Sequence, residues 1–298
     1  MNPPNKHHYI PAFYLSRWAG NDGCLCQWSR PYGQKVKPLR VHPNATGYAR
    51  KLYELRGYEP QIAQQVEQNF FQPVDALAAA VLSEAEATAG KVNWTAEKRS
   101  SWTRFIISLL LRCPEDVAAF RTNWERDFFK VDTISQEKYE KFRTADDPPL
   151  FSDYLRSRPE PQRERLLFNV FLSLFSYEDT GQYINDMNWG FLIFSRSELE
   201  FLTSDRPIIR TSGIKPPDGH IVFPVGPNSV FVAGATENIY RRIAEIKPRE
   251  LIREINRQVV GSAVKFAYSR DDSSVRFMQN RFGTTPQPRI AEALKFSD

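Results

Sequence analysis

The sequence predicts an α+β fold with a β-hairpin near the N-terminus, a helical middle and a C-terminal antiparallel sheet with late helices. Three observations support this class. The stretch CLCQWSRPYGQKVKPLRV alternates around a Pro-Tyr-Gly turn, which predicts strands near 24–30 and 34–41. Apolar residues recur with a helical period from about 60 to 180. After residue 187, short segments rich in β-branched and aromatic residues are bounded by turns, as in antiparallel sheet.

Prolines divide the predicted helices. Pro11 suits the start of a short helix over 11–19, and Pro73 should kink or split a helix that begins at 60. The other predicted helices cover Thr95 to about 113, Pro114 to about 130, and regions near 135–143, 150–157, 160–177, 236–246 and 248–265. VKFAYSR is expected as a strand or a helix end, and SVRFMQ as a strand. The hairpin can join the later strands in one sheet.

The organisation predicted is one α+β domain over residues 1–298, with sub-regions at 1–58, 59–185 and 186–298, because no linker interrupts the chain. The 41% of apolar residues indicates a well-packed core. No stretch is long and apolar enough to span a bilayer, and the N-terminus lacks a signal-peptide pattern. The three cysteines make no disulfide framework, so a reducing cytoplasm without membrane contact is expected.

Charge is unevenly distributed along the chain. Residues 1–60 carry +6, residues 61–200 carry −6 and residues 201–298 carry +5, within a total of +5. The basic ends can simply pack against the acidic middle. Alternatively, they form a shared basic surface for an anion such as RNA or DNA. The charge pattern does not indicate which protein would be a partner.

The opening Lys6-His7-His8-Tyr9-Ile10-Pro11 concentrates polar side chains at a chain end, where sequences are usually frayed. Pro11 favours an extended conformation before it, so one histidine should face inward and the other outward. An imidazole there can act as acid or base or bind a metal. The alternative is a histidine that only bonds the backbone and anchors the terminus.

Three further charges stand out. Asp205, in Thr203-Ser204-Asp205, lies at the end of one apolar strand and before another, where it can serve a site or merely cap a turn. Arg112 shares a helix face with Phe105 and Leu109, and Glu67 also lies on a face that should be buried. Each therefore needs a partner, or its charge must reach solvent at the helix edge. The two are expected to pair with each other or with groups of a site.

Other signatures are weak or missing. Cys24 and Cys26 lie on one side of a strand, but a zinc site would need two more ligands, and His42 is the only other histidine nearby. Cys113 is expected in the core, and Ser204 lacks the setting of a serine hydrolase. The sequence contains no phosphate-binding glycine loop, dinucleotide fingerprint, HExxH motif or kinase signature.

Five segments, taken in order, resemble the bacterial family called domain of unknown function 4238: KHHYIPAFYLSRWA, SLLLRCPE, LTSDRPII, FPVGPNSV and INRQVVGSAVKFAYS. The resemblance implies an α+β cytoplasmic protein with no activity that can be carried over. It marks as motif positions Lys6, His7, His8, Tyr9, Pro11, Tyr14, Leu15, Arg112, Pro114, Ser204, Asp205 and Pro207. Trp18 departs from a more usual Phe, and Arg206 from a small polar residue, which makes the surroundings of Asp205 more cationic.

The resulting hypothesis is that the N-terminal segment folds inward on Ile10, Phe13, Tyr14 and Trp18 and holds a histidine near Asp205. The catalytic candidates are His7, His8, Asp205, Arg112 and Glu67, and the substrate-binding candidates are Lys6, Tyr9, Tyr14, Ser204 and Arg206. This set suits phosphodiester hydrolysis, with a histidine as acid or base, an arginine on the phosphate, and a carboxylate that orients the histidine or holds a divalent metal such as Mg²⁺. The most specific version of this hypothesis is a nuclease directed at RNA that acts as a toxin or in phage defence.

Two alternatives stay open. One is a non-enzymatic protein that binds nucleic acid or another protein and uses the same residues as a structural network. The other is a hydrolase or transferase for a small anionic ligand. An enzyme predicts a pocket lined by His7 or His8 and Asp205, whereas a structural network predicts these groups buried and paired. A nucleic-acid binder predicts an open basic face.

Overall fold

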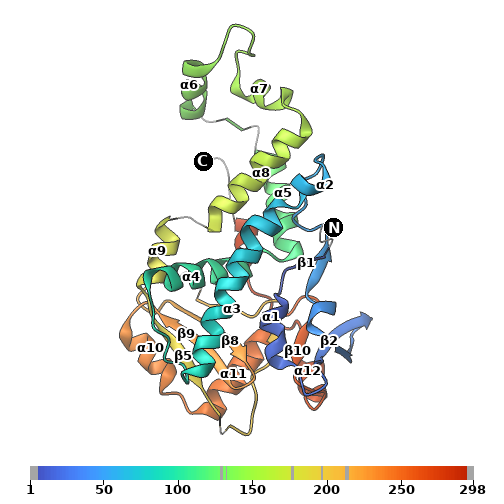
Figure 1. Cartoon of the computed structure of the whole chain (residues 1–298), viewed down its shortest axis with the longest axis vertical. Coiled ribbons are helices and arrows are strands. Elements are labelled where there is room, and N and C mark those ends of the chain that lie inside the picture. Colours follow the sequence, from blue (N-terminus) through green and yellow to red (C-terminus); the bar gives the residue numbers. More distant parts are fainter. Residues whose placement is uncertain are drawn as a thin grey trace.

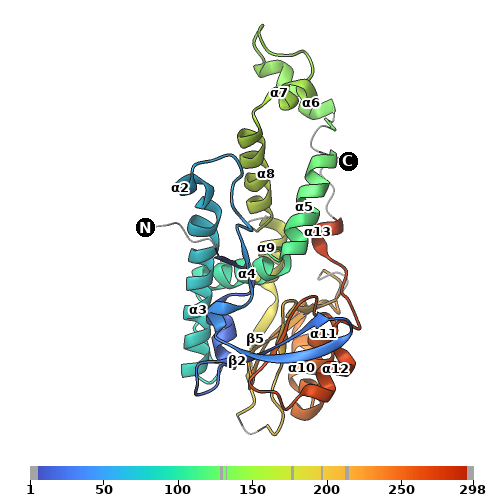
Figure 2. The same cartoon turned by 90° about the vertical axis from the view of Figure 1, so that its right-hand side faces the viewer.

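The computed structural model describes residues 6–127, 130–131, 133–175, 178–195, 197–211 and 215–293. Two antiparallel four-stranded sheets and the late helices lie at one end of an elongated molecule (Figures 1 and 2). From there, α5 (Pro114–Asp127) and α8 (Glu160–Phe175) extend toward α6 (Thr133–Phe142) and α7 (Phe151–Ser157), which lie at the opposite end. The predicted α+β class is confirmed.

The predicted hairpin is confirmed as β2 (Leu25–Tyr32) and β3 (Lys35–Val41), and it does join later strands. The order of this sheet is β3-β2-β10-β6, with β10 at Ala267–Ser269 and β6 at Thr203–Ser204. β10 pairs antiparallel with both neighbours, so Ala267 lies opposite Trp28 on one side and Ser204 on the other. The sheet thus brings the Thr203-Ser204-Asp205 segment beside the N-terminal region.

The second sheet has the order β5-β9-β8-β7, with β5 at Asn188–Ile193, β9 at Ser229–Gly234, β8 at His220–Gly226 and β7 at Ile209–Arg210. Side chains alternate between its two faces. Phe223 and Phe231 pack on Trp102 of α4 (Ala96–Leu111) in the main core. Val222 and Val232 face the other way and form a separate cluster with α11 (Pro248–Gly261). Helices therefore cover both faces.

The helical middle follows the predicted breaks. α2 (Pro60–Ala63) leads to a π-helical turn at Glu67–Phe71, and α3 (Gln72–Ala87) begins directly after it. Pro73 lies in the first turn of α3, where its missing N–H costs least. The sequence predicted that Pro73 kinks or splits this helix, and the π-turn is the form that this break takes. The remaining helices are α9 (Glu178–Asp186), α10 (Glu237–Ala244), α12 (Val275–Arg281) and α13 (Ile290–Ala293).

The N-terminal segment folds inward, as predicted. β1 (Lys6–His8) pairs antiparallel with β4 (Tyr48–Arg50), and α1 (Ala12–Leu15) runs into a 3₁₀ turn at Ser16–Trp18. Tyr9, Ile10, Tyr14, Leu15 and Trp18 are all buried in the main core. Phe13 is partly buried and packs on Phe105 of α4. The segment NATGYARKLYEL, residues 44–55, has no clear periodicity, so the sequence does not predict this small sheet.

SVRFMQ is a helix and not the expected strand. It forms α12, whose buried Met278 and partly buried Phe277 pack on the hairpin sheet, whereas Arg276 and Gln279 are exposed. In so short a segment, a single pair of apolar residues between polar ones is compatible with both the helical and the strand period. The pattern therefore could not distinguish a helix from a strand. The neighbouring VKFAYSR contains β10, in line with the strand reading.

Candidate functional site

His7 is the inward-facing histidine. Its ring is buried and stacks on Tyr53 with 5.5 Å between the ring centroids. Nδ1 accepts the backbone N–H of Tyr53 at 2.9 Å, so Nε2 carries the proton and donates to Oε1 of Gln64 at 2.5 Å. Both ring nitrogens therefore bond groups inside the protein, which fits the alternative of a histidine that anchors the N-terminal segment. The catalytic role of His7 stays a prediction.

His8, Glu67 and Arg112 form a second group, which we call the Arg112 cluster. Arg112, at the end of α4, is fully buried, and its Nη1 donates to Oδ1 of Asp75 at 2.9 Å. Its Nε and Nη2, Oε2 of Glu67 and Nε2 of half-buried His8 are all buried without a hydrogen-bond partner. Such atoms are unusual in folded proteins and mark a place where water or a ligand is expected. The expected Glu67–Arg112 ion pair is replaced by Asp75–Arg112.

The pKa values of this cluster follow from burial and from the charge of Arg112. Burial raises the pKa of Glu67 to about 7, and the Arg112 charge limits the rise. Burial also lowers the pKa of His8, and the same positive charge lowers it further. Near neutral pH, the cluster thus combines a neutral imidazole, a half-protonated carboxyl and a guanidinium. These are the forms needed for acid–base chemistry on an anion.

Asp205 fixes a loop and does not contact a histidine. Its carboxylate is 3% exposed and accepts the backbone N–H groups of Val264 at 2.9 Å, Lys265 at 2.6 Å and Phe266 at 3.0 Å. Its own N–H donates to the carbonyl of Phe266 at 2.9 Å. Because these donors occupy the carboxylate, the expectation that Asp205 orients an imidazole is wrong for the described residues.

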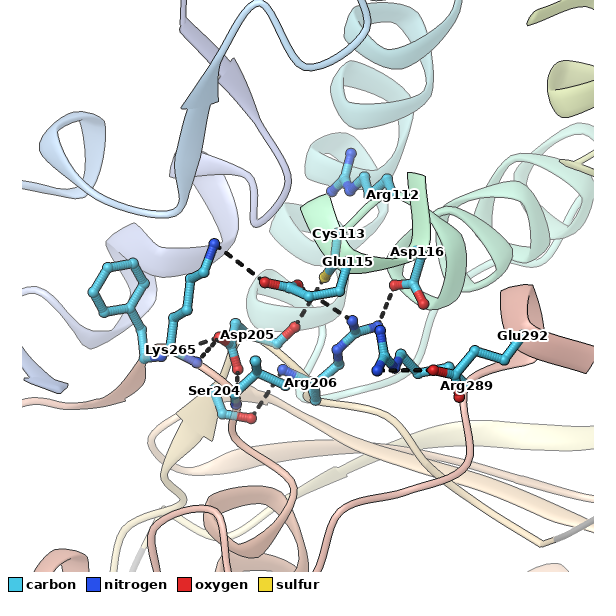
Figure 3. A network of polar contacts seen from close by, with 12 residues as sticks. Arg112, Cys113, Glu115, Asp116, Ser204, Asp205, Arg206, Lys265, Arg289 and Glu292 are labelled. Atoms are coloured by element: carbon cyan, nitrogen blue, oxygen red, sulfur yellow. Dashed lines mark hydrogen bonds and ion pairs between the residues drawn. The ribbon is translucent and has the colours of Figure 1, made fainter. Parts of the chain in front are cut away.

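Arg206 leads a separate ion-pair network (Figure 3). Its Nη1 donates to Asp116 in the first turn of α5, and its Nη2 lies 3.5 Å from Oε2 of Glu115. The other oxygen of Glu115 lies 3.1 Å from Nζ of Lys265. Burial raises the pKa of Asp116 to about 6, against the opposing charge of Arg206. The start of α5 is thereby tied to the loop that Asp205 holds.

The predicted single centre is in fact two adjoining networks. The Tyr53 hydroxyl donates to the carbonyl of Arg112 at 2.5 Å, and Cys113 Sγ donates to the carbonyl of Asp205 at 3.2 Å. Tyr53 and the Arg112–Cys113 backbone thus connect His7 to Asp205. The side chains of Arg112 and Asp205 belong to different networks on either side of this connection.

Most of the predicted substrate-binding residues lie inside the protein. The Tyr14 hydroxyl bonds Thr203 Oγ1 and the carbonyl of Pro224, both at 2.7 Å, and Ser204 Oγ accepts the N–H of Arg206 at 3.0 Å. Tyr9 is 2% exposed. These three are buried packing residues, which corrects the prediction. Lys6 is exposed, with Nζ 4.7 Å from the ring centre of Tyr48, and Arg206 reaches a cavity.

Two cavities meet at Val264 and together form what we call the basic trough. The arginine cavity, of about 140 Å³, is lined by Arg206, Arg210 and Arg289, with Glu115 as its acidic residue. The hairpin cavity, of about 430 Å³, is lined by Arg30, Lys265, Phe266 and Phe282. Of these residues, only Arg206 was among the predicted site residues. The alternation of apolar Ile209 with cationic Arg210 in a predicted strand was the one signal in the sequence.

The described part of the chain contains no group of three or more His, Cys, Asp and Glu residues that could hold a metal ion. Cys24, Cys26 and Cys113 are free thiols, and the suggested zinc site at Cys24 and Cys26 therefore lacks ligands there. Among the described residues, no helix is long and apolar enough to cross a membrane.

These features define an α+β protein with two polar networks and a basic trough beside its sheets. A family model described as "Protein of unknown function (DUF4238)" matches residues 6–273. The chain belongs to this family, as its motifs indicated. No match was found among curated proteins or among solved structures.

Proposed function

We propose that the protein binds single-stranded nucleic acid along the basic trough. The observation that carries this proposal is the lining of the two cavities that share Val264: five cationic side chains and one carboxylate. Cationic grooves bind the phosphate backbone, and aromatic side chains in such grooves stack on exposed bases. Phe266 is half-buried in the hairpin cavity beside Lys265, which supports a single strand over a duplex.

The buried network fits this binding role. Asp205 holds the loop that carries Val264 and Lys265, and those two residues line the trough. His7 ties β1 to Tyr53 and Gln64. In this proposal Asp205 is a positioning residue for the trough, and His7 anchors the N-terminal strand, in line with the structural-network alternative. A cytoplasmic location accords with three free thiols.

The test is titration of the protein with labelled single-stranded RNA, single-stranded DNA and duplex DNA at several salt concentrations. We expect single strands to bind best, with affinity that falls steeply as salt rises. Lys265→Gln should weaken binding and reduce the slope of log affinity against log salt by about 0.7, the value for one lost phosphate contact. Arg242→Gln, an exposed arginine on α10, is the matched control. Salt-independent binding, or equal losses in both variants, would contradict the proposal.

A second candidate function is phosphodiester cleavage at the Arg112 cluster. It is favoured by the four unpartnered buried atoms of His8, Glu67 and Arg112. In this scheme neutral His8 accepts a proton, Glu67 donates one, and Arg112 stabilises the phosphate. The RNA-directed role as toxin or in phage defence belongs to this candidate.

Cleavage is tested by incubation with RNA, single-stranded DNA and duplex DNA, with and without Mg²⁺ or Mn²⁺. His8→Ala and Glu67→Gln should abolish any cleavage while they leave strand binding at the trough intact. Asp205→Ala, once its folding is checked, should lose activity only as far as it loses stability. Equal cleavage by wild type and by both cluster variants would exclude this site.

A further inference from the structure

The arginine cavity differs from the hairpin cavity in size and in chemistry. It has about 140 Å³, against about 430 Å³ for its neighbour, and three guanidinium groups line it. It lies where the ends of α4 and α5 meet β7 and the segment 286–290. A single water needs only about 10–15 Å³, so the cavity has room for a small polyatomic group.

The three arginines are fixed before any ligand arrives. Arg206 is held by Asp116 and Glu115, and Figure 3 shows Arg289 beside it with its guanidinium on Glu292, 2.8 Å away. Arg210 donates to the carbonyl of Thr211 at 3.3 Å and to that of Pro288 at 3.0 Å. Fixed donors bind an anion with less loss of side-chain entropy than mobile ones.

Charge in the arginine cavity is only partly compensated. Arg210 bonds backbone carbonyls, and none of the carboxylates in the described residues forms an ion pair with it. Nη2 of Arg206 is buried and makes no hydrogen bond, and Oε2 of Glu115 lies 3.5 Å away as its ion-pair partner. The cation of Arg210, which has no carboxylate partner among the described residues, beside a guanidinium donor without a hydrogen bond favours an entering anion. Planar guanidinium groups match the oxygens of phosphate better than any other side chain does.

We infer that the arginine cavity binds the terminal phosphate monoester of a nucleic-acid strand, while the hairpin cavity holds the adjoining nucleotides. This inference rests on the proposed function of the trough. A phosphodiester carries one negative charge and continues on both sides, so it suits an open trough. A terminal monoester carries about two charges at neutral pH and ends the chain, so it suits a small cationic cavity. Val264 marks the boundary between the two parts.

The experiment compares three versions of one labelled 12-nucleotide strand, with a 5′-phosphate, a 3′-phosphate or hydroxyl groups at both ends. We expect one phosphate-ended strand to bind wild type about tenfold more tightly than the hydroxyl-ended strand, the effect of one good charged contact. Arg210→Gln should remove this preference, so that the variant binds the phosphate-ended and the hydroxyl-ended strands with equal affinity. Lys265→Gln should weaken all three equally, and Arg242→Gln should change none.

Competition by inorganic phosphate and by nucleoside monophosphates separates the sources of the anion. Direct binding of a nucleoside monophosphate, measured by calorimetry, together with no strand binding would overturn the strand-end inference and the proposed function alike. Strand binding without an end preference would overturn the inference alone. If Arg210→Gln unfolds, Arg210→Lys is used instead, because it retains the charge and should keep part of the preference. An unchanged tenfold preference in the Arg210 variant would overturn the assignment of the phosphate to this cavity.

Discussion

At the scale of a single residue, Glu67 shows how burial sets chemistry. Its carboxyl is 7% exposed, and burial raises its pKa to about 7 from an ordinary 4.5. Between these pH values the unfolded chain loses the proton while the folded protein keeps it. Proton binding therefore favours the folded state, in full below about pH 4.5, and this contribution is lost as the pH rises to about 7.

Glu67→Gln removes this titration. We expect the free energy of unfolding of the variant to match that of wild type near pH 4.5 and to exceed it by up to about 3 kcal/mol at pH 7. Urea unfolding over this pH range measures the difference. Asp116, whose pKa is also raised to about 6, contributes equally to both proteins and cancels. Glu97→Gln, at an exposed position of α4, should keep the wild-type slope; the same slope in the Glu67 variant would contradict the assignment.

At the scale of an element, one carboxylate organises the loop that follows α11. The loop from Val264 to Phe266 has three consecutive backbone N–H groups aimed at Asp205. Hydrogen bonds to a charged acceptor are about twice as strong as neutral ones. The loop carries Val264, the residue shared by both cavities, so the shape of the basic trough depends on Asp205, which is buried and lines neither cavity.

Asp205→Asn tests this dependence, because an amide offers one oxygen where the carboxylate offers two. We expect a loss of about 2–4 kcal/mol in the free energy of unfolding, the value of one to two charged hydrogen bonds. Hydrogen exchange should quicken at the amides of 264–266 more than elsewhere. Asp218→Asn, at an exposed turn, serves as control. Retained protection of these three amides would show that the loop is held by other contacts.

At the scale of the whole molecule, local patterns predicted the elements well. The hairpin, the helices between Pro60 and Phe175 and the antiparallel strands after 187 all follow hydrophobic periods within about 15 residues. The site was harder to predict, because its hydrogen bonds join residues that are far apart in the sequence. Arg112 bonds Asp75, Asp205 bonds the backbone of 264–266, and Arg210 bonds Pro288. The sequence marked Arg112 and Glu67 as charges in need of partners, and Asp205 as a group that serves a site or caps a turn. The sequence does not identify the partner of each charge, because any buried group of opposite charge or any buried amide could satisfy it.

The same distant packing bears on the single domain predicted over 1–298. Trp102 of α4 is fully buried, and its ring contacts Phe191, Phe223 and Phe231 of the second sheet at centroid distances of 5.3–5.9 Å. The helical middle and the C-terminal sheet thus share one core. If they form one cooperative unit, tryptophan fluorescence and far-ultraviolet circular dichroism should report a single coincident unfolding transition.

Trp102→Ala should then destabilise both parts together, by about 3–5 kcal/mol, because it leaves a large cavity between them. Its fluorescence and circular dichroism transitions should move to lower urea by the same amount and stay coincident. Phe142→Ala, at a position 83% exposed on α6, should move neither. Two separated transitions in the Trp102 variant would mean that the sheet and the helical middle fold independently. In that case the packing of Trp102 on Phe191, Phe223 and Phe231 would be an interface between two domains, and each polar network would belong to its own domain.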